Sequence, residues 1–423
     1  MPAPEIVTFG CRLNACESEI IRRAAREAGL DDAVIVNTCA VTAEAERQAR
    51  QAIRRARRER PGARIIVTGC AATLAPQRYA AMPEVDAVLD NEAKLQRDSY
   101  ASLTPIAAFP RKRGKERVWS GDDRQPSPPM AGQGWGGGLS RVRTYLQVQQ
   151  GCDHRCTFCI IPFARGPSRS VSAETVIPEA LAMVAAGVRE IVLTGVDLTA
   201  YGVDLPGRPS LGALARRLLA EVPELPRLRL SSLDPAEIDD ELWALFAEEE
   251  RLMPHLHLSL QAGDDMILKR MKRRHDRAQA VATAHRARTL RPEAAIGADL
   301  IAGFPTEDEA MFRNSLDLVG ECGIAFLHVF PYSARPGTPA ARMPEVAPAL
   351  VRERAARLRE AGAAMLAREL RTRIGTVGDV LIERPGSGRA GFYAPVDCPP
   401  EMAGISRMRF TGVAGGRLIG EPA

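Results

Sequence analysis

Short apolar runs alternate with helical stretches over the first hundred residues. Buried-strand patterns occur at residues 5–11, 33–39 and 63–70, and a helical pattern at residues 18–30 begins at a serine and has a glycine near its end. A strongly basic helical stretch separates the second strand from the third. Strands that alternate with helices indicate a parallel sheet, whose ligands gather beyond the carboxyl ends of its strands. We therefore expect residues 1–100 to form an α/β domain.

The pattern breaks after residue 100 and then resumes. Residues 101–140 are rich in Pro, Gly and Ser and predict a linker. A second series of about six strand units follows. Each unit ends in small or polar residues, which would lie together at one end of a barrel. This series predicts a partial (β/α)6 barrel over residues 141–368, with its site at the carboxyl-terminal face of the strands. The predicted strand units are residues 143–152, 189–202, 227–235, 255–265, 295–307 and 326–338.

The chain ends in a different pattern. Residues 349–373 form a charged amphipathic helix, and the rest of residues 369–423 consists of short strands separated by glycine and proline turns. We expect a small β-barrel, a fold that often binds nucleic acid through a basic face and exposed aromatic side chains. A plain structural cap is the alternative. The candidate RNA contacts are Arg384, Arg389, Phe392 and Tyr393.

Composition places the chain among soluble globular proteins of two to four domains, with 423 residues, 45% of them hydrophobic and 26% charged. Its longest apolar runs are far too short to cross a bilayer, and its first residues show no secretory signal. We expect a cytoplasmic protein that does not contact a membrane. No P-loop or dinucleotide-binding glycine motif occurs between a strand and a helix.

Positive charge is concentrated in one stretch of the chain, although the net charge is only +5. Residues 47–64 carry many arginines, and Glu59 is the only acidic residue among them. Such a block could neutralise phosphates of a nucleic acid, or it could be a solvated helix face. The sequence leaves both interpretations open.

Three cysteines in C-x3-C-x2-C spacing, Cys152, Cys156 and Cys159, point to a metal centre rather than to disulfides. Thiolates hold iron–sulfur clusters, usually four for each cluster. Three thiolates would leave one iron of a 4Fe-4S cluster open for chemistry, much as a catalytic zinc keeps one free position. The alternative is a zinc site with His154 as the fourth ligand, although a short loop would strain to wrap one metal there.

Three more cysteines each close a predicted strand of the first sheet, namely Cys11, Cys39 and Cys70. Because parallel strands end at one edge of a sheet, these residues would converge there. We therefore expect a second cluster with three protein ligands. Cys16 falls outside this pattern, and we expect it to be structural.

With both cysteine sets, the chain resembles the radical S-adenosylmethionine (SAM) methylthiotransferase family over almost its whole length. The segments that carry the resemblance are FGCRLNACES, VNTCAVT, VTGC, GCDHRCTFCIIPFARG, HLSLQAGDDMILKRMKR, DLIAGFPTE and FPYSARPGTPAA. The C-terminal part resembles the RNA-binding TRAM module, as a shorter and weaker match. TCAVTAEAERQARQAIRRARRERPGARIIVTGCAA, VDAVLDNEAK and LTGVDLTAYG are most similar to the threonylcarbamoyladenosine branch.

The resemblance implies two 4Fe-4S clusters. Cys152, Cys156 and Cys159 would hold the cluster whose open iron binds SAM and cleaves it to a radical. Cys11, Cys39 and Cys70 would hold an auxiliary cluster that carries the sulfur. The implied reaction transfers a methylthio group to carbon 2 of the adenine of N6-threonylcarbamoyladenosine at position 37 of tRNA.

The resemblance also implies contacts that are less specific. Candidate SAM-binding residues, each of which could equally be an ordinary packing or loop residue, are Phe158, Thr194, Gly195, Ser231, Ser232, Gln261 and Gly303. Arg165, Arg169 and Ser170 could hold the modified base or a phosphate, since arginine pairs well with carboxylate and phosphate. A structural salt bridge is the alternative for these arginines.

The expected partners are a tRNA anticodon stem-loop and a low-potential electron donor of the flavodoxin or ferredoxin type, with the enzyme acting as a monomer. Two other methylthiotransferase substrates remain open, isopentenyladenosine in tRNA and an aspartate of a ribosomal protein. A non-catalytic RNA-binding protein that contains zinc is the alternative from another class.

Overall fold

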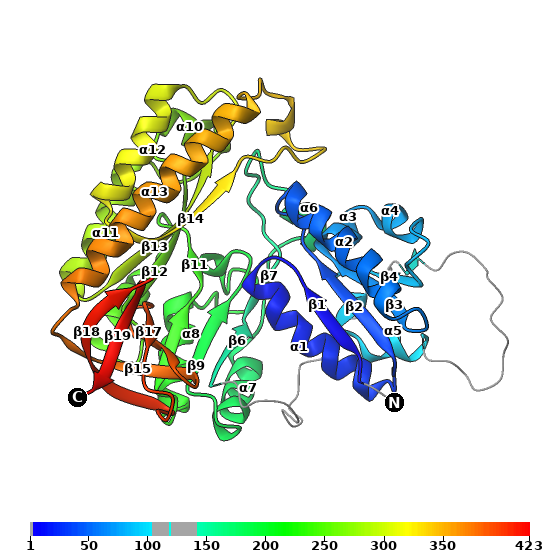
Figure 1. Ribbon diagram of the computed structural model, residues 1–423, viewed down its shortest axis with the longest axis horizontal. Coiled ribbons are helices and arrows are strands. Elements are labelled where there is room, and N and C mark those ends of the chain that lie inside the picture. The colour runs from blue at the N-terminus through cyan, green and yellow to red at the C-terminus, as the bar shows by residue number, and fades with distance from the viewer. Residues whose placement is uncertain (1–2, 104–117, 120–141) are drawn as a thin grey trace.

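The computed structural model of the chain describes residues 3–103, 118–119 and 142–423, which form one parallel sheet, one open barrel and one small closed barrel (Figure 1). Most of the predicted linker therefore lies outside the described residues. Residues 101–103 are described, and so are Val118 and Trp119, which form a strand of the first sheet.

The first sheet contains five parallel strands in sequential order, two more than the sequence predicted. The strands are β1 (Glu5–Thr8), β2 (Ala33–Thr38), β3 (Arg64–Gly69), β4 (Ala87–Leu89) and β5 (Val118–Trp119). The additional strands are short and have no long apolar run to reveal them. The helices of this unit are α1 (Arg12–Glu27), α2 (Ala43–Glu59), α3 (Cys70–Leu74), α4 (Pro76–Ala80) and α5 (Arg97–Ala101).

The first helix begins earlier than predicted, at Arg12 instead of Ser18. Serine is a common N-cap, but the Ser18 hydroxyl is buried inside the helix, where it donates to the Asn14 carbonyl oxygen at 2.8 Å. Cys11 is the N-cap residue instead. The first strand ends at Thr8, so Cys11 lies in the turn after the strand and not at its last position.

The predicted six-stranded partial barrel is confirmed. Its parallel strands are β6 (Arg143–Gln147), β9 (Glu190–Thr194), β10 (Arg227–Leu230), β12 (His255–Gln261), β13 (Ala295–Ala302) and β14 (Ile324–Pro331), and β11 (Ser232–Leu233) extends the β10 position. The surrounding helices are α7 (Ala173–Ala185), α8 (Leu211–Glu221), α9 (Asp240–Glu248), α10 (Asp265–Met271), α11 (Arg277–Leu290), α12 (Glu309–Glu321) and α13 (Pro348–Thr372).

The two faces of the barrel strands differ in polarity. Along β12, Leu256, Leu258 and Leu260 belong to the apolar core that the strands share with the surrounding helices. His255 and His257, which alternate with these leucines, therefore point to the opposite face, the barrel lumen. Because strands of a parallel sheet are usually apolar on both faces, these buried polar side chains point to a function inside the lumen.

The predicted C-terminal module is a closed barrel with strand order β15-β16-β17-β19-β18. Its strands are β15 (Val377–Arg384), β16 (Ser387–Ala390), β17 (Pro395–Asp397), β18 (Ile405–Ala414) and β19 (Arg417–Pro422). Figure 1 shows it beneath the open barrel, close to the ends of β12 and β9.

The aromatic RNA contacts predicted on this module are wrong. Phe392 is 8% exposed and packs in the barrel core. Tyr393 stacks on His255 of the open barrel at a ring-centroid distance of 4.4 Å, and Arg389 lies over the Tyr393 ring. These side chains therefore serve the contact between the two barrels. Arg384, the remaining candidate, is exposed at the end of β15, and Arg407 and Arg409 are exposed on β18.

Among the described residues, no helix combines the length and apolar character that crossing a membrane requires.

Candidate functional site

The loop between β7 (Gln149–Gln150) and α6 (Ile161–Arg165) carries the first cysteine triplet. Gly151 starts the loop at φ +73°, and a Cβ there would lie 1.8 Å from the Pro167 carbonyl oxygen, so no other residue fits. The Cys152 amide donates to the Gly166 carbonyl oxygen at 3.2 Å and closes the loop. The structure thus holds three free thiols, those of Cys152, Cys156 and Cys159, on one short loop.

The surroundings of the three thiols differ. Burial and the neighbouring Asp197 carboxylate raise the pKa of Cys152 to about 12. Burial alone would also raise the pKa of Cys156, but hydrogen bonds from His154 and Arg273 and the charge of Arg273 lower it below its usual value. Arg273 Nη1 lies 3.6 Å from Cys156 Sγ. A fixed positive charge beside this loop suits a ligand set that binds as thiolates.

His154, the alternative zinc ligand, does lie close to the triplet. Its Nε2 is 3.3 Å from Asp197 Oδ2 and 3.6 Å from Glu237 Oε2. Cys152, His154 and Asp197 offer ligand atoms that all lie within 4.8 Å of one another. Geometry alone therefore leaves the zinc alternative open.

The second cysteine set converges as the sheet topology predicts. Cys39 directly follows β2, Cys70 is the first residue of α3, and Cys11 caps α1. A Cβ on Gly10 would lie 2.5 Å from Cys39 Sγ, which shows how closely the Cys11 turn approaches Cys39. Burial, together with the nearby Cys11 and Cys70 thiolates, raises the pKa of Cys39 to about 12. The structure therefore brings three free thiols together at one sheet edge, as a three-ligand cluster requires.

The two cysteine sets are neighbours in space. Cys70 begins α3 and Cys159 precedes α6, and these two helices pack against each other. Burial and the charges of Cys156 and Cys70 raise the pKa of Cys159 to about 11. The first sheet is therefore part of the same site as the open barrel.

A buried polar network joins the two units behind the cysteines. The Asn91 side-chain amide lies 3.7 Å from Cys70 Sγ and donates to the Ala164 carbonyl oxygen at 2.8 Å. Lys94 donates to Asn91 Oδ1 at 2.7 Å and to Glu17 at 2.6 Å. Glu17 and Lys94 are fully buried, so this network fixes the relative position of the two cysteine sets.

The predicted substrate contacts lie in different environments. Arg165 is 4% exposed, and its guanidinium donates to Glu17 and Asn14. It therefore forms a structural salt bridge, which was the alternative to a substrate contact. The Ser170 hydroxyl accepts a hydrogen bond from the Gly202 amide at 2.8 Å. The Arg169 side chain is 43% exposed and lies 3.7 Å from Glu92, which leaves it accessible to a substrate.

Two orphaned polar atoms lie at the carboxyl ends of the barrel strands, where a SAM molecule would need partners. The Ser231 hydroxyl and Gln147 Oε1 are buried and have no hydrogen-bond partner among the described residues. Thr194 is buried at the end of β9. A Cβ on the adjacent Gly195 would lie 2.8 Å from Gln149 Oε1, so this glycine allows a close approach. These residues fit a polar ligand across the barrel mouth.

The other predicted cofactor residues surround the same mouth. Phe158 packs edge-on against Phe304 at a ring-centroid distance of 6.5 Å, which is an ordinary packing contact. Gln261 ends β12 at φ +69°, and Gly303 follows β13 at φ +73°. Ser232 begins β11 and is half-buried. No contact of these side chains assigns them to SAM.

Sequence reasoning missed several residues around the cysteines. Asp197, Arg273, Glu17 and Lys94 all lie in segments that carry the family resemblance, but the sequence does not show that they lie beside the cysteines. Charged residues within otherwise apolar helical positions, such as Glu17, are the signal that could have found them.

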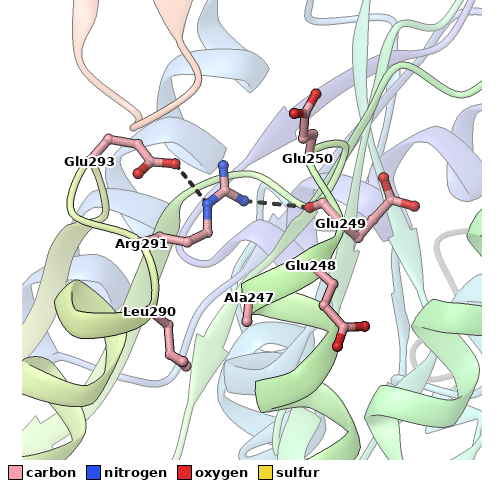
Figure 2. A pocket seen from close by; sticks show the side chains of 7 residues that line it. All are labelled: Ala247, Glu248, Glu249, Glu250, Leu290, Arg291 and Glu293. Carbon is pink, nitrogen blue, oxygen red and sulfur yellow. Dashed lines mark hydrogen bonds and ion pairs between the residues drawn. The ribbon is translucent and has the colours of Figure 1, made fainter.

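A cavity elsewhere in the described part of the chain is unrelated to the cysteines. This cavity of about 480 Å³ opens between α9 and α11 and is lined by Ala247, Glu248, Glu249, Glu250, Leu290, Arg291 and Glu293 (Figure 2). It lies near the amino-terminal ends of β12 and β13, opposite the face that carries a barrel site. Arg291 donates to Glu293 at 2.7 Å, so its charge is already neutralised.

Two family models match the chain. The model described as "Radical SAM superfamily" covers residues 146–319, and the model described as "Uncharacterized protein family UPF0004" covers residues 4–90. They correspond to the open barrel and the first sheet. The match supports an iron–sulfur centre at the first triplet, and not the zinc alternative.

Three relatives are similar over most of the chain. The chain is 49% identical over 94% of its length, and 92% of the relative, to the threonylcarbamoyladenosine tRNA methylthiotransferase MtaB of Rickettsia prowazekii. It is 38% identical to the MtaB of Thermotoga maritima, over 81% of this chain and 77% of that one. It is 34% identical to the tRNA-2-methylthio-N(6)-dimethylallyladenosine synthase of Sorangium cellulosum, over 92% and 84%.

Among solved structures, the radical S-adenosylmethionine methyltransferase TsrM from Kitasatospora setae has a similar fold. Its complex with tryptophan and a SAM analogue aligns with a TM-score of 0.54 and 15% identity, over 80% of this chain and 75% of that one. At this identity the similarity supports the radical SAM fold alone.

Proposed function

The chain belongs to the radical SAM tRNA methylthiotransferase family, and from this we propose that it transfers a methylthio group to N6-threonylcarbamoyladenosine. The target is carbon 2 of the adenine at position 37 of tRNA, and the product is 2-methylthio-N6-threonylcarbamoyladenosine. The observation that carries this proposal is the convergence of two three-thiol sets across the packed helices α3 and α6.

Two 4Fe-4S clusters and SAM are the cofactors that these residues fit. Cys152, Cys156 and Cys159 would hold the SAM-binding cluster, and Cys11, Cys39 and Cys70 would hold the auxiliary cluster. When bound, these groups supply the radical that takes the hydrogen from carbon 2 and the sulfur that replaces it. The six cysteines are thus the proposed metal ligands. Ser231, which the sequence already makes a candidate beside Ser232, and Gln147, which the structure adds, are further candidate SAM contacts.

The protein itself positions the reactants. The buried network of Asn91, Lys94, Glu17 and Arg165 keeps the two thiol sets in fixed relation, and reaction steps of this kind depend on such positioning. An anticodon-loop base is unpaired or readily splayed and can therefore enter a buried site. Exposed arginines, among them Arg169, Arg407 and Arg409, would contact tRNA phosphates, which position the loop without choosing the base.

We further propose that the protein acts as a cytoplasmic monomer. It would receive electrons from a low-potential donor of the flavodoxin or ferredoxin type. The first basic helix supports tRNA binding only in part, because Arg47 and Arg55 of α2 already pair with Glu44 and Glu59.

Nucleoside mass spectrometry of tRNA tests the substrate. We expect 2-methylthio-N6-threonylcarbamoyladenosine to be absent from a deletion strain and to return with the wild-type gene. Unchanged levels of this nucleoside would contradict the proposal. Loss of 2-methylthio-isopentenyladenosine instead would assign the chain to the other tRNA branch, and loss of neither would direct attention to the ribosomal-protein substrate.

A further inference from the structure

The lumen of the open barrel contains a histidine–aspartate–histidine triad that the cysteine sites do not use. His257 on β12 and His328 on β14 flank Asp299 on β13. His257 Nε2 lies 2.9 Å from Asp299 Oδ1, and His328 Nδ1 lies 3.1 Å from the same oxygen. Both imidazoles thus share one carboxylate oxygen.

Strand register places the triad in one layer of the lumen. Asp299 pairs with His328 across β13 and β14, and His257 pairs with Gly297 across β12 and β13. A Cβ on Gly297 would lie 2.5 Å from His257 Nδ1, so the glycine leaves room for the imidazole. The apolar faces of the strands point to the helices, and this polar layer points inward.

The triad is connected to the first cysteine triplet through Arg273. Ser259, two residues beyond His257 on β12, accepts a hydrogen bond from Arg273 at its carbonyl oxygen at 2.8 Å. The same guanidinium reaches Cys156 Sγ at 3.6 Å. Two residues of a strand span about 7 Å. A base presented to the cysteines would therefore come within reach of the triad.

The triad presents an oriented hydrogen-bonding atom to the lumen. Burial would raise the pKa of Asp299, but the charges and hydrogen bonds of His257 and His328 hold it below its usual value. An ionised Asp299 accepts from the nearest ring N–H of each histidine and so fixes the orientation of both rings. His328 Nε2 has no partner among the described residues, and the His328 side chain is 49% exposed.

We propose that this triad binds the threonylcarbamoyl group on N6 of the adenosine and thereby selects tRNA that carries this group. The inference rests on the proposed function, since it concerns the same substrate. Because His328 donates its Nδ1–H to Asp299, its Nε2 would accept a hydrogen bond, and the group offers a ureido N–H and a hydroxyl as donors. An apolar dimethylallyl group offers no such donor and would displace water from His328 Nε2 without replacing its hydrogen bond.

A divalent cation is the competing occupant, because His257, Asp299 and His328 offer ligand atoms within 4.8 Å of one another. The charges nearby disfavour it. Burial and the positive charges of Arg229, Arg12 and Arg389 depress the pKa of His255, two residues before His257 on β12. The same arginines would repel a cation bound at the triad.

The test measures binding of two anticodon stem-loop RNAs that differ only at position 37, one with N6-threonylcarbamoyladenosine and one with adenosine. Fluorescence anisotropy is recorded anaerobically with the reconstituted full-length protein. We expect the wild type to prefer the modified RNA. His328→Leu should reduce this preference about tenfold, as expected for one lost hydrogen bond. Its affinity for the unmodified RNA should not change.

Two further variants make the result specific. His328→Gln should keep most of the preference, because its amide can replace the ring nitrogen. His285→Leu is the matched control, since His285 is exposed on α11 and contacts only the Glu321 carbonyl oxygen. If His328→Leu fails to retain its iron, His328→Met, another apolar substitution, replaces it in the comparison.

The outcomes separate the two proposals. An unchanged preference in His328→Leu, or an equal loss of affinity for both RNAs, would overturn the triad assignment. A stoichiometric non-iron metal that disappears in this variant would replace it with a cation site. A wild-type enzyme that makes no 2-methylthio product from the modified RNA would refute the proposed function itself.

Discussion

Arg165 and Glu17 form a buried, two-pronged ion pair that joins the open barrel to the first sheet. Arg165 Nη1 lies 2.7 Å from Glu17 Oε1, and Arg165 Nη2 lies 2.9 Å from Glu17 Oε2. The pair lies beside the auxiliary cysteines, because the charge of Arg165 acts on the thiols of Cys11, Cys39 and Cys70. One cation thus contributes both to docking of the two units and to the electrostatics of the auxiliary site.

Arg165→Met should destabilise the protein by about 3–5 kcal/mol, because it leaves Glu17 buried with Lys94 as its only charged partner. Thermal unfolding of the reconstituted protein measures the loss. Arg47→Gln is the control, since it removes an exposed pair with Glu44 and should leave the unfolding midpoint almost unchanged. Equal midpoints for Arg165→Met and the wild type would show that the pair does not hold the units together.

Cys39→Ala should abolish methylthiolation but retain reductive cleavage of SAM. The substitution removes one of three converging thiols from the auxiliary site and leaves Cys152, Cys156 and Cys159 intact. The iron content, measured together with sulfide, should fall from about eight to about four irons per chain. Full product formation by this variant would show that the auxiliary ligands are wrongly assigned.

Cys322→Ala is the matched control for Cys39, because Cys322 is also buried and free but lies at the end of α12, away from both sets. It should keep both clusters and full product formation. Cys16→Ala should behave in the same way, since Cys16 Sγ only contacts the Tyr145 carbonyl oxygen at 3.5 Å.

The sequence predicted the parts of the site that depend on strand ends. Apolar runs marked the strands of both units, and parallel strands end at one edge, so the convergence of Cys39 and Cys70 followed from their spacing. Cys11 also joins them, although its helix starts six residues before the predicted serine. The sequence pattern is therefore sufficient to predict a set of ligands when one sheet positions all of them.

Contacts between units could not be predicted in this way. Arg165 pairs with a residue 148 positions away in another unit, and no periodicity relates the two. Phe392 and Tyr393 looked like RNA contacts because composition does not say which side of a small barrel packs against a neighbour. The triad in the barrel lumen was missed for a similar reason, because His257, Asp299 and His328 come from three separate strands.

Tyr393→Ala should loosen the contact between the C-terminal barrel and the open barrel. Tyr393 adopts φ +78°, a strained conformation for a non-glycine residue, and is held there by stacking on His255 and edge-on contact with Phe326. Loss of this half-buried, stacked aromatic ring should cost about 2 kcal/mol, measured by thermal unfolding.

Two comparisons test the role of the Tyr393 ring. Tyr393→Phe keeps the stack and removes only the 3.3 Å hydrogen bond from Arg12, so its midpoint should stay close to that of the wild type. Phe163→Ala removes an aromatic ring that is 65% exposed and should also change the midpoint little. A Tyr393→Ala protein as stable as these two would argue against the stack as an anchor.

Glu179 on α7 should make stability depend on pH between about 5 and 7. Burial raises its pKa to about 7, and the charge of Arg23 only partly offsets this. The folded state therefore binds a proton more tightly than the unfolded state, whose carboxyl titrates near 4.3. Stability from this group is fully present below the unfolded pKa and declines as pH rises through the folded value, by about 2 kcal/mol after allowance for its partial exposure.

Glu179→Gln should flatten the pH dependence of the unfolding midpoint across this range, whereas Glu174→Gln, which removes an exposed carboxylate on the same helix, should not. Parallel pH profiles for Glu179→Gln and the wild type would show that Glu179 is not the group responsible.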